Sequence, residues 1–276
     1  MTAGRNVRLA LTGAAAARAA LAGAAALTGR PAGAPWRRMN YAKRPVTLLG
    51  GPALAASATV SAVLGAPAGT RTAAAVVGAV SGLVGGYDDL AGSRPEQAQD
   101  KGLAGHLAAI KAGRVSAGAV KVAGIGAAAA VAAVLTRGDR RSVVDGVLTT
   151  GLVAGTANLL NLLDLRPGRA GKAGTLVAAT TLAGPAGGLV AGPLGATLAT
   201  LPEDLGERIM LGDCGANALG ALLGLRLASI PGRAPRVGLL GGVVALTLAS
   251  EKVSFTKVIE ATPGLRELDR LGRRPS

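Results

Sequence analysis

Long apolar stretches limit what this chain can fold into more than any other feature. Residues 46–65, 115–135 and 143–163 are each about long enough to cross the ~30 Å hydrocarbon core of a bilayer. Half of the 276 residues are hydrophobic and the mean hydropathy is +0.43. A soluble domain of this length could also bury a large core, so stretch length decides. We expect an all-α, polytopic transmembrane helical bundle that forms a single integral membrane domain over residues 1–276.

The apolar pattern predicts about nine spans, within a range of eight to ten. They cover residues 9–28, 46–65, 72–87, 115–135, 143–163, 171–185, 187–202, 215–230 and 237–250. The sixth and seventh are short and share a Gly/Pro-rich joint. Arg5 and Arg8 precede the first Ala-rich run, as in a signal peptide. Because Arg18 interrupts that run and many apolar stretches follow, we favour a first transmembrane helix.

Small residues dominate these stretches, and aromatic residues make up only 1% of the chain, so no aromatic belt marks the membrane interfaces. Small side chains let helices approach closely in lipid. A biased codon pool would give the same composition. The single cysteine, Cys214, excludes an intramolecular disulfide and a Cys-based zinc site.

The distribution of basic residues predicts the orientation. With nine spans, the loops on one side hold 19 Lys and Arg residues and those on the other side hold 8. The positive-inside rule makes the first side cytoplasmic, in a cell membrane. The loop TRGDRR at 136–141 does not follow this rule, because it is basic although it lies on the other side. Attraction to anionic headgroups explains most of the net charge of +15, so we expect no nucleic-acid partner.

Acidic residues stand at the ends of otherwise apolar stretches. Asp88 and Asp89 close one stretch, Asp164 closes another and Asp213 opens a third. All four fall on the cytoplasmic side of the nine-span topology. Carboxylates are costly near a bilayer and usually mark a site there. Several of them on one aqueous face would suit a metal ion and a phosphate group. Lys121 and Asp145 fall inside spans, and the simplest interpretation is that they pair with each other or snorkel.

Five local patterns follow one another in a fixed order. They are KRPVTLLGG at 43–51, GGYDDLAG at 85–92, KGLAGHL at 101–107, NLLNLLDLRPG at 158–168 and LGDCGANALG at 211–220. The ordered set resembles the polyprenyl-phosphate N-acetylhexosamine-1-phosphate transferases. This membrane family includes phospho-MurNAc-pentapeptide translocase and the GlcNAc-1-phosphate transferases. The resemblance covers a core of about residues 40–225.

The resemblance implies phosphoryl transfer for a cell-envelope polymer. A polyprenyl (undecaprenyl) phosphate would attack the β-phosphate of a UDP-sugar, and UMP would leave. The family requires Mg²⁺, which prefers carboxylates, water and phosphate oxygens. The expected partners are therefore the prenyl phosphate lipid, a nucleotide sugar and the membrane; the sequence leaves a homodimer open.

The same resemblance assigns roles by motif. Asp88, Asp89 and Asp213 are the expected catalytic residues, with Asp213 and Asp89 as metal ligands. An alternative for Asp213 is the N-cap of its own helix, and for the Asp pair a solvated turn. Lys101 would suit a diphosphate oxygen or only an anionic lipid, and the single histidine, His106, is more often structural.

Nucleotide binding falls on one helix face and the loop after it. Asn158, Asn161 and Asp164 lie at i, i+3 and i+6, which keeps them on or near one face. Interhelical hydrogen bonding is the alternative for the two asparagines. Arg166, Arg169 and Lys172 follow on the same side and could neutralise a phosphorylated substrate.

The chain departs from the family pattern in the loop after Asp164. The family usually reads N-x-x-N-L-x-D-G-x-D-G-L-A, and here Leu165, Pro167 and Arg169 replace a Gly, an Asp and a Leu. One expected nucleotide-contacting carboxylate is therefore missing, and the family's His-rich loop is absent. These departures favour a different nucleotide sugar, or a non-catalytic polyprenyl-phosphate binder or lipid transporter on the same fold. A small-solute transporter would predict paired internal repeats, and we find no convincing repeat.

Overall fold

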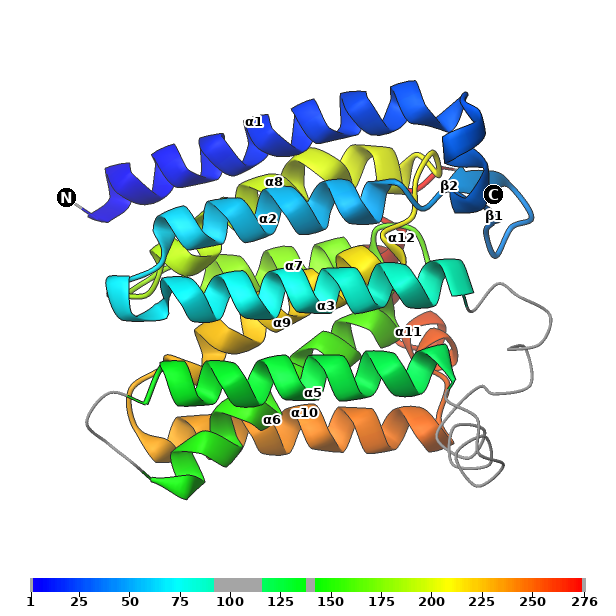
Figure 1. Ribbon diagram of the computed structural model, residues 1–276. Helices are drawn as coiled ribbons and strands as arrows, with labels where there is room; N and C mark the ends of the chain where they lie inside the picture. Colours follow the sequence, from blue (N-terminus) through cyan, green and yellow to red (C-terminus); the bar gives the residue numbers. More distant parts are fainter. Residues whose placement is uncertain (1, 92–115, 138–141, 275–276) are drawn as a thin grey trace.

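The computed structural model describes residues 2–91, 116–137 and 142–274 (Figure 1). The chain is 79% helical. The long helices lie side by side and are α1 (Thr2–Thr28), α2 (Gly50–Gly65), α3 (Arg71–Ala91), α5 (Ala117–Leu135), α6 (Val143–Leu163), α7 (Arg169–Thr180), α8 (Gly188–Leu205), α9 (Gly212–Ala228) and α10 (Arg233–Lys252). The predicted all-α class is confirmed.

The remaining elements are short and lie mostly at one end of the bundle. The strands β1 (Arg37–Met39) and β2 (Pro45–Thr47) form an antiparallel hairpin, and η1 (Pro31–Trp36) precedes them. The chain closes with α11 (Phe255–Ala261) and α12 (Leu265–Arg270), and η2 (Ala68–Thr70) joins α2 to α3. Figure 1 places the hairpin, α11 and α12 at the end opposite the N-terminus.

Each predicted span coincides with one long helix, but with shifted ends. The segment predicted from residue 46 begins as a helix only at Gly50, because residues 45–47 form β2. Three helices are long and apolar enough to cross a membrane: α1 from Ala3, α5 and α6. A fourth qualifies if α10 and α11, which meet at a 96° bend, count as one span. These helices are compatible with a membrane protein.

The sixth predicted segment corresponds to α7, which is too short to traverse the bundle without the residues that follow it. The 12 residues of α7 extend only about 18 Å at 1.5 Å per residue. Residues 181–187 continue toward the other end, where the Asn6 side chain donates a hydrogen bond to the Leu182 carbonyl over 3.3 Å. The chain therefore reaches the N-terminal end of α1 before α8 returns.

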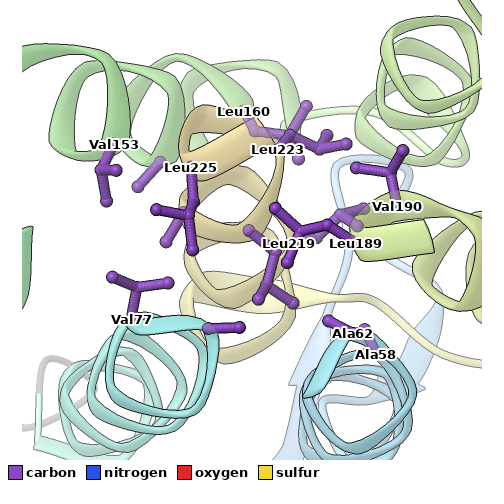
Figure 2. Close-up of a cluster of buried hydrophobic side chains, with 14 of the residues drawn as sticks. Ala58, Ala62, Val77, Val153, Leu160, Leu189, Val190, Leu219, Leu223 and Leu225 are labelled. Carbon is purple, nitrogen blue, oxygen red and sulfur yellow. The ribbon is translucent and has the colours of Figure 1, made fainter. Parts of the chain in front are cut away.

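Helix α9 forms the centre of the bundle. Every residue from Cys214 to Leu227 is buried, so this helix is enclosed on all sides, as expected for a core helix. Figure 2 shows Leu219, Leu223 and Leu225 of α9 pointing in different directions, surrounded by side chains of α2, α3, α6 and α8. The start of α9, which carries Asp213, is thereby fixed relative to four neighbouring helices.

The outer faces of the long helices carry exposed apolar side chains. Examples come from six helices: Leu11, Leu64, Leu83, Val122, Val147 and Leu248. So much apolar surface is typical of a face that meets lipid or another protein. Inside, α1 and α8 approach so closely that a Cβ added at Gly13 would lie 2.0 Å from the Gly192 carbonyl oxygen. The packing of α1 on α8 supports its assignment as a bundle helix rather than a cleaved leader.

Candidate functional site

The four acidic residues singled out from the sequence gather at one end of the bundle. Asp88 and Asp89 lie in the last turn of α3, Asp164 directly follows α6, and Asp213 lies in the first turn of α9. These helices bring together motifs separated by up to 125 residues. We call the group of Asp88, Asp89, Asp164 and Asp213, together with Lys121 and Asp204 introduced below, the carboxylate cluster.

Asp89 caps the start of α9 from outside that helix. Its carboxylate oxygens accept hydrogen bonds from the backbone N–H groups of Asp213, over 3.0 Å, and Cys214, over 2.9 Å. A carboxylate at this position satisfies free N–H groups and interacts favourably with the helix dipole. The interpretation of Asp213 as the N-cap of its own helix is therefore wrong, because α9 begins at Gly212 after Leu211.

Gly212 makes this contact possible. Its φ is +58°, and an added Cβ would lie 2.8 Å from a carboxylate oxygen of Asp89. Both the left-handed backbone and the space beside Asp89 therefore require glycine.

Replacement of Gly212 by alanine is expected to lower the free energy of unfolding by about 2 kcal/mol, the cost of one strained backbone position. The measurement is thermal unfolding of the purified protein in detergent. Gly126→Ala is the matched control, because no atom lies within 4 Å of a Cβ added at that helical glycine. Equal stability of the two variants would contradict the close approach of Asp89.

Lys121 lies between two of the carboxylates. Its ammonium nitrogen is 2.7 Å from a carboxylate oxygen of Asp88 and also forms an ion pair with Asp213. All three side chains are more than three-quarters buried. The predicted pairing of Lys121 with Asp145 is wrong: Asp145 instead pairs with Arg233 and Arg236. Because α5 and α6 are consecutive and antiparallel, the starts of these two helices face opposite ends of the bundle.

Asp164 extends the cluster toward α8. The backbone N–H of Gly212 donates a hydrogen bond to its carboxylate, and Asp204 of α8 is close enough to repel it. Burial, followed by this repulsion, raises the pKa of Asp164 well above its ordinary value. Asp204 is itself buried and accepts a hydrogen bond over 3.1 Å from the backbone N–H of Gly168. The cluster thus holds five carboxylates, two of which pair with Lys121.

Asn158 and Asn161 lie on α6 with Asp164, as their spacing predicts. Asn158 is exposed and Asn161 is half-buried. Lys101 and His106 lie outside the described residues.

The three basic residues after Asp164 have different surroundings. The Arg166 guanidinium stacks on the Tyr41 ring, 4.3 Å from its centroid. Arg169 is buried and makes a two-pronged ion pair with Asp269 over 2.8 and 3.1 Å. Lys172 donates to the backbone carbonyls of Leu268 and Asp269. Arg169 and Lys172 therefore bind the C-terminal segment, whereas Arg166 contacts Tyr41 and the carbonyl of Leu165.

Asp269 is held ionised by this arrangement. Burial alone would raise the pKa of Asp269, but the hydrogen bonds from Arg169 and the charges of Arg169 and Arg273 bring it below its ordinary value. Arg273 also donates to the carbonyl of Pro167 over 2.9 Å. The loop at residues 165–169 is thus fixed to the C-terminal segment by several charged contacts.

The hairpin that follows α1 supports the site from the other side. The backbones of Thr47 and Met210 pair over 3.0 Å, just before the start of α9. Arg38 donates to the Asp89 backbone carbonyl, and a Cβ added at Gly51 would lie 2.1 Å from the Leu211 carbonyl oxygen. The KRPVTLLGG segment therefore contacts the LGDCG segment directly.

An apolar groove of about 610 Å³ runs beside the cluster between α2 and α3. Leu83, Tyr87 and Leu90 of α3 line it, together with Trp36 and with Cys214 of α9. Cys214 is the residue whose N–H group binds Asp89. The groove therefore begins next to the carboxylates and continues along the outer surface of the bundle.

The donor set suits a hard cation shared with a ligand. Among the described residues, no three His, Cys, Asp or Glu side chains are placed to hold a metal ion together. Magnesium commonly binds through one or two carboxylates and completes its shell with water and substrate phosphates. Asp88 and Asp213, which already face one cation, are the pair that fits this pattern best.

No protein-family model matches the sequence, and no curated protein matches it.

Proposed function

We propose that this protein is a membrane phosphoglycosyltransferase that moves a sugar-1-phosphate from a UDP-sugar to a polyprenyl phosphate, with release of UMP. The observation that carries the proposal is the convergence of Asp88, Asp89, Asp164 and Asp213 beside an apolar groove. Such a place suits a reaction between a charged nucleotide and a phosphate on an apolar chain. The motif resemblance supplies the particular reaction.

The groove would hold the first part of the prenyl chain. Its lining is almost entirely apolar, and each buried CH₂ group contributes about 0.8 kcal/mol. A chain in the groove would place its phosphate near Asp88 and Asp89. Like charges repel, so the phosphate needs a cation there. Lys121 is the cation among the described residues of the cluster, and it can exchange a carboxylate for a phosphate oxygen.

Asp88 and Asp213 would hold Mg²⁺ together with a phosphate oxygen of the donor. This assignment revises the pair expected from the sequence, since both carboxylate oxygens of Asp89 already accept backbone N–H groups. When bound, the metal ion would neutralise negative charge on the diphosphate. Asp89 would then act by positioning Asp213.

The transfer needs little proton chemistry. A phosphate monoester is already largely ionised near pH 7. Its oxygen forms a bond to the β-phosphorus of the donor as the bond to the UMP oxygen breaks, and UMP leaves as an anion. The residues of this chain therefore act mainly by positioning and by charge.

The loop at 165–169 would help to select the nucleotide-sugar donor. Arg166 lies beside Asp164 and is the one of the three basic residues that donates no hydrogen bond to the described part of the C-terminal segment. A donor that carries an additional negative group on its sugar would suit this cation. We do not assign donor contacts to Arg169 and Lys172, because their polar atoms bind the C-terminal segment.

The decisive assay combines purified protein, undecaprenyl phosphate, Mg²⁺ and a panel of UDP-sugars, and it measures UMP release. We expect UMP from at least one donor only when lipid and Mg²⁺ are both present. Binding of lipid without UMP from any donor would instead favour a non-catalytic polyprenyl-phosphate binder. That second candidate is favoured by the altered loop, which lacks the family's second carboxylate.

The proposed topology has about nine membrane crossings in a cell membrane, with the carboxylate cluster on the cytoplasmic face. The cluster lies where α3 ends and α9 begins, at the end of the bundle that holds the hairpin, and α5 ends and α6 begins at the other end. The bias of basic residues toward the loops at the cluster's end supports the orientation.

Single cysteines at Ala42 and Ser142, in a Cys214→Ala background, are therefore expected to react from opposite sides of intact membranes. Ala42 lies in the exposed hairpin turn and Ser142 directly precedes α6. The measurement is labelling of each variant by a membrane-impermeant maleimide in right-side-out and inverted vesicles. Labelling of both positions from one side would overturn the topology and leave the fold unaffected.

A further inference from the structure

A second polar cavity lies at the end of the bundle opposite the carboxylate cluster. Its volume is about 680 Å³. The walls come from the end of α5, the start of α6 and the turn between α9 and α10, which meet at the end where Figure 1 places the N-terminus. Its charged lining residues are Arg137, Asp145, Arg233 and Arg236.

The charges in this cavity do not balance. Asp145 accepts hydrogen bonds from Arg233 over 2.8 Å and from Arg236 over 2.6 Å. Arg137 makes no side-chain hydrogen bond or ion pair with any residue that the structure describes. The described lining therefore has three guanidinium groups and one carboxylate, a formal excess of two positive charges.

These arginines also lie on the side of the proposed topology that has fewer basic residues. In the proposed orientation they lie on the side that holds only 8 of the Lys and Arg residues. The positive-inside rule disfavours basic residues there. Yet three of the eight line one cavity, although they come from two segments almost 100 residues apart.

We propose that this cavity binds a phosphate group, carried either by a lipid or by free phosphate. Planar guanidinium groups bind phosphate oxygens through paired, charge-assisted hydrogen bonds. Arg137 offers a complete guanidinium, and Arg233 and Arg236 each keep N–H groups that Asp145 does not use. This site is separate from the proposed transferase site and does not depend on it.

Titration of the purified protein with two probes tests the site and shows whether its phosphate group comes from a lipid or from free phosphate. The probes are inorganic phosphate and soluble dihexanoyl phosphatidic acid, measured by calorimetry in a nonionic detergent. Binding of both indicates recognition of the phosphate itself, and binding of phosphatidic acid alone indicates a lipid ligand. Both results support the proposal if they depend on Arg137.

Arg137→Ala is expected to weaken binding roughly tenfold, as the loss of one charge-assisted contact implies. Asp145→Asn is expected to strengthen it, because Arg233 and Arg236 lose their competing carboxylate; a merely structural role for Asp145 would not do so. Arg8→Ala, which removes an exposed cation of α1 outside the cavity, is the matched control and should bind as the unmodified protein does.

The proposal fails if neither probe binds the unmodified protein, if Arg137→Ala binds with unchanged affinity, or if Arg8→Ala weakens binding equally. Thermal unfolding of each variant shows whether it remains folded. Arg137 has no ion pair to lose among the described residues, so its variant keeps the test valid even if Asp145→Asn unfolds. None of these results bears on UMP release.

Discussion

Replacement of Asp213 by asparagine is expected to reduce Mg²⁺-dependent UMP release by at least about 100-fold, the effect of losing one group that stabilises transition-state charge. Asp213 and Asp88 face a common cation, and an amide binds Mg²⁺ much more weakly than a carboxylate. The fold should persist, because the backbone N–H of Asp213, which binds Asp89, is unchanged. The measurement is initial rate as a function of Mg²⁺ concentration.

Glu251→Gln is the matched control, because it removes an exposed carboxylate from the last turn of α10. It should leave the rate unchanged. A near-normal rate for Asp213→Asn would remove Asp213 from the metal site. Equal loss in both variants would indicate a general effect of charge rather than a role for this carboxylate.

Replacement of Lys121 by methionine is expected to abolish turnover and to lower the free energy of unfolding by about 3 kcal/mol, as is usual when one partner of a buried ion pair is removed. Asp88 and Asp213 would then face each other without a cation. Magnesium should restore part of the lost stability, because a ligand that binds only the folded state stabilises it. The measurement is the unfolding temperature with and without Mg²⁺.

The stabilisation by Mg²⁺ should be larger in Lys121→Met than in the unmodified protein, where the ammonium competes for the same two carboxylates. Calcium, which also prefers oxygen ligands but is larger, offers a comparison. Lys252→Met is the control, since Lys252 is exposed at the end of α10. If Mg²⁺ stabilises both variants equally, the ion does not bind between Asp88 and Asp213.

The sequence was informative about the helices because apolar stretches of span length leave few alternatives. It was less informative where local chemistry overrides hydropathy. Residues 46–49, of which three are apolar, extend the predicted span, but Pro45–Thr47 pairs with Arg37–Met39 as a hairpin. Thr47 also pairs with the segment before α9, a contact over more than 160 residues that no local pattern indicates.

The carboxylates of the cluster could be found from the sequence, but their partners could not. Asp88, Asp89, Asp164 and Asp213 stand out because acids are rare at the ends of apolar stretches. Lys121 has the same property, yet its partners lie 33 and 92 residues away, so Asp145 was the nearer choice. Asp204 lies in a polar stretch, LPEDLGER, at the end of α8, where an acidic residue is not unusual; its importance comes from burial beside Asp164.

The unusual loop after Asp164 has a physical explanation in the fold. Pro167 offers its carbonyl to Arg273, and Arg169 binds Asp269. Two of the three residues that depart from the motif pattern, Pro167 and Arg169, thus contact the C-terminal segment.

The pairing of Arg169 with Asp269 also sets an order for biosynthesis. Asp269 follows Arg169 by 100 residues. When synthesis has just completed α7, the carboxylate that pairs with Arg169 has therefore not yet been made. A nascent polypeptide would therefore complete α8, α9 and α10 before the loop at 165–169 acquires its final contacts.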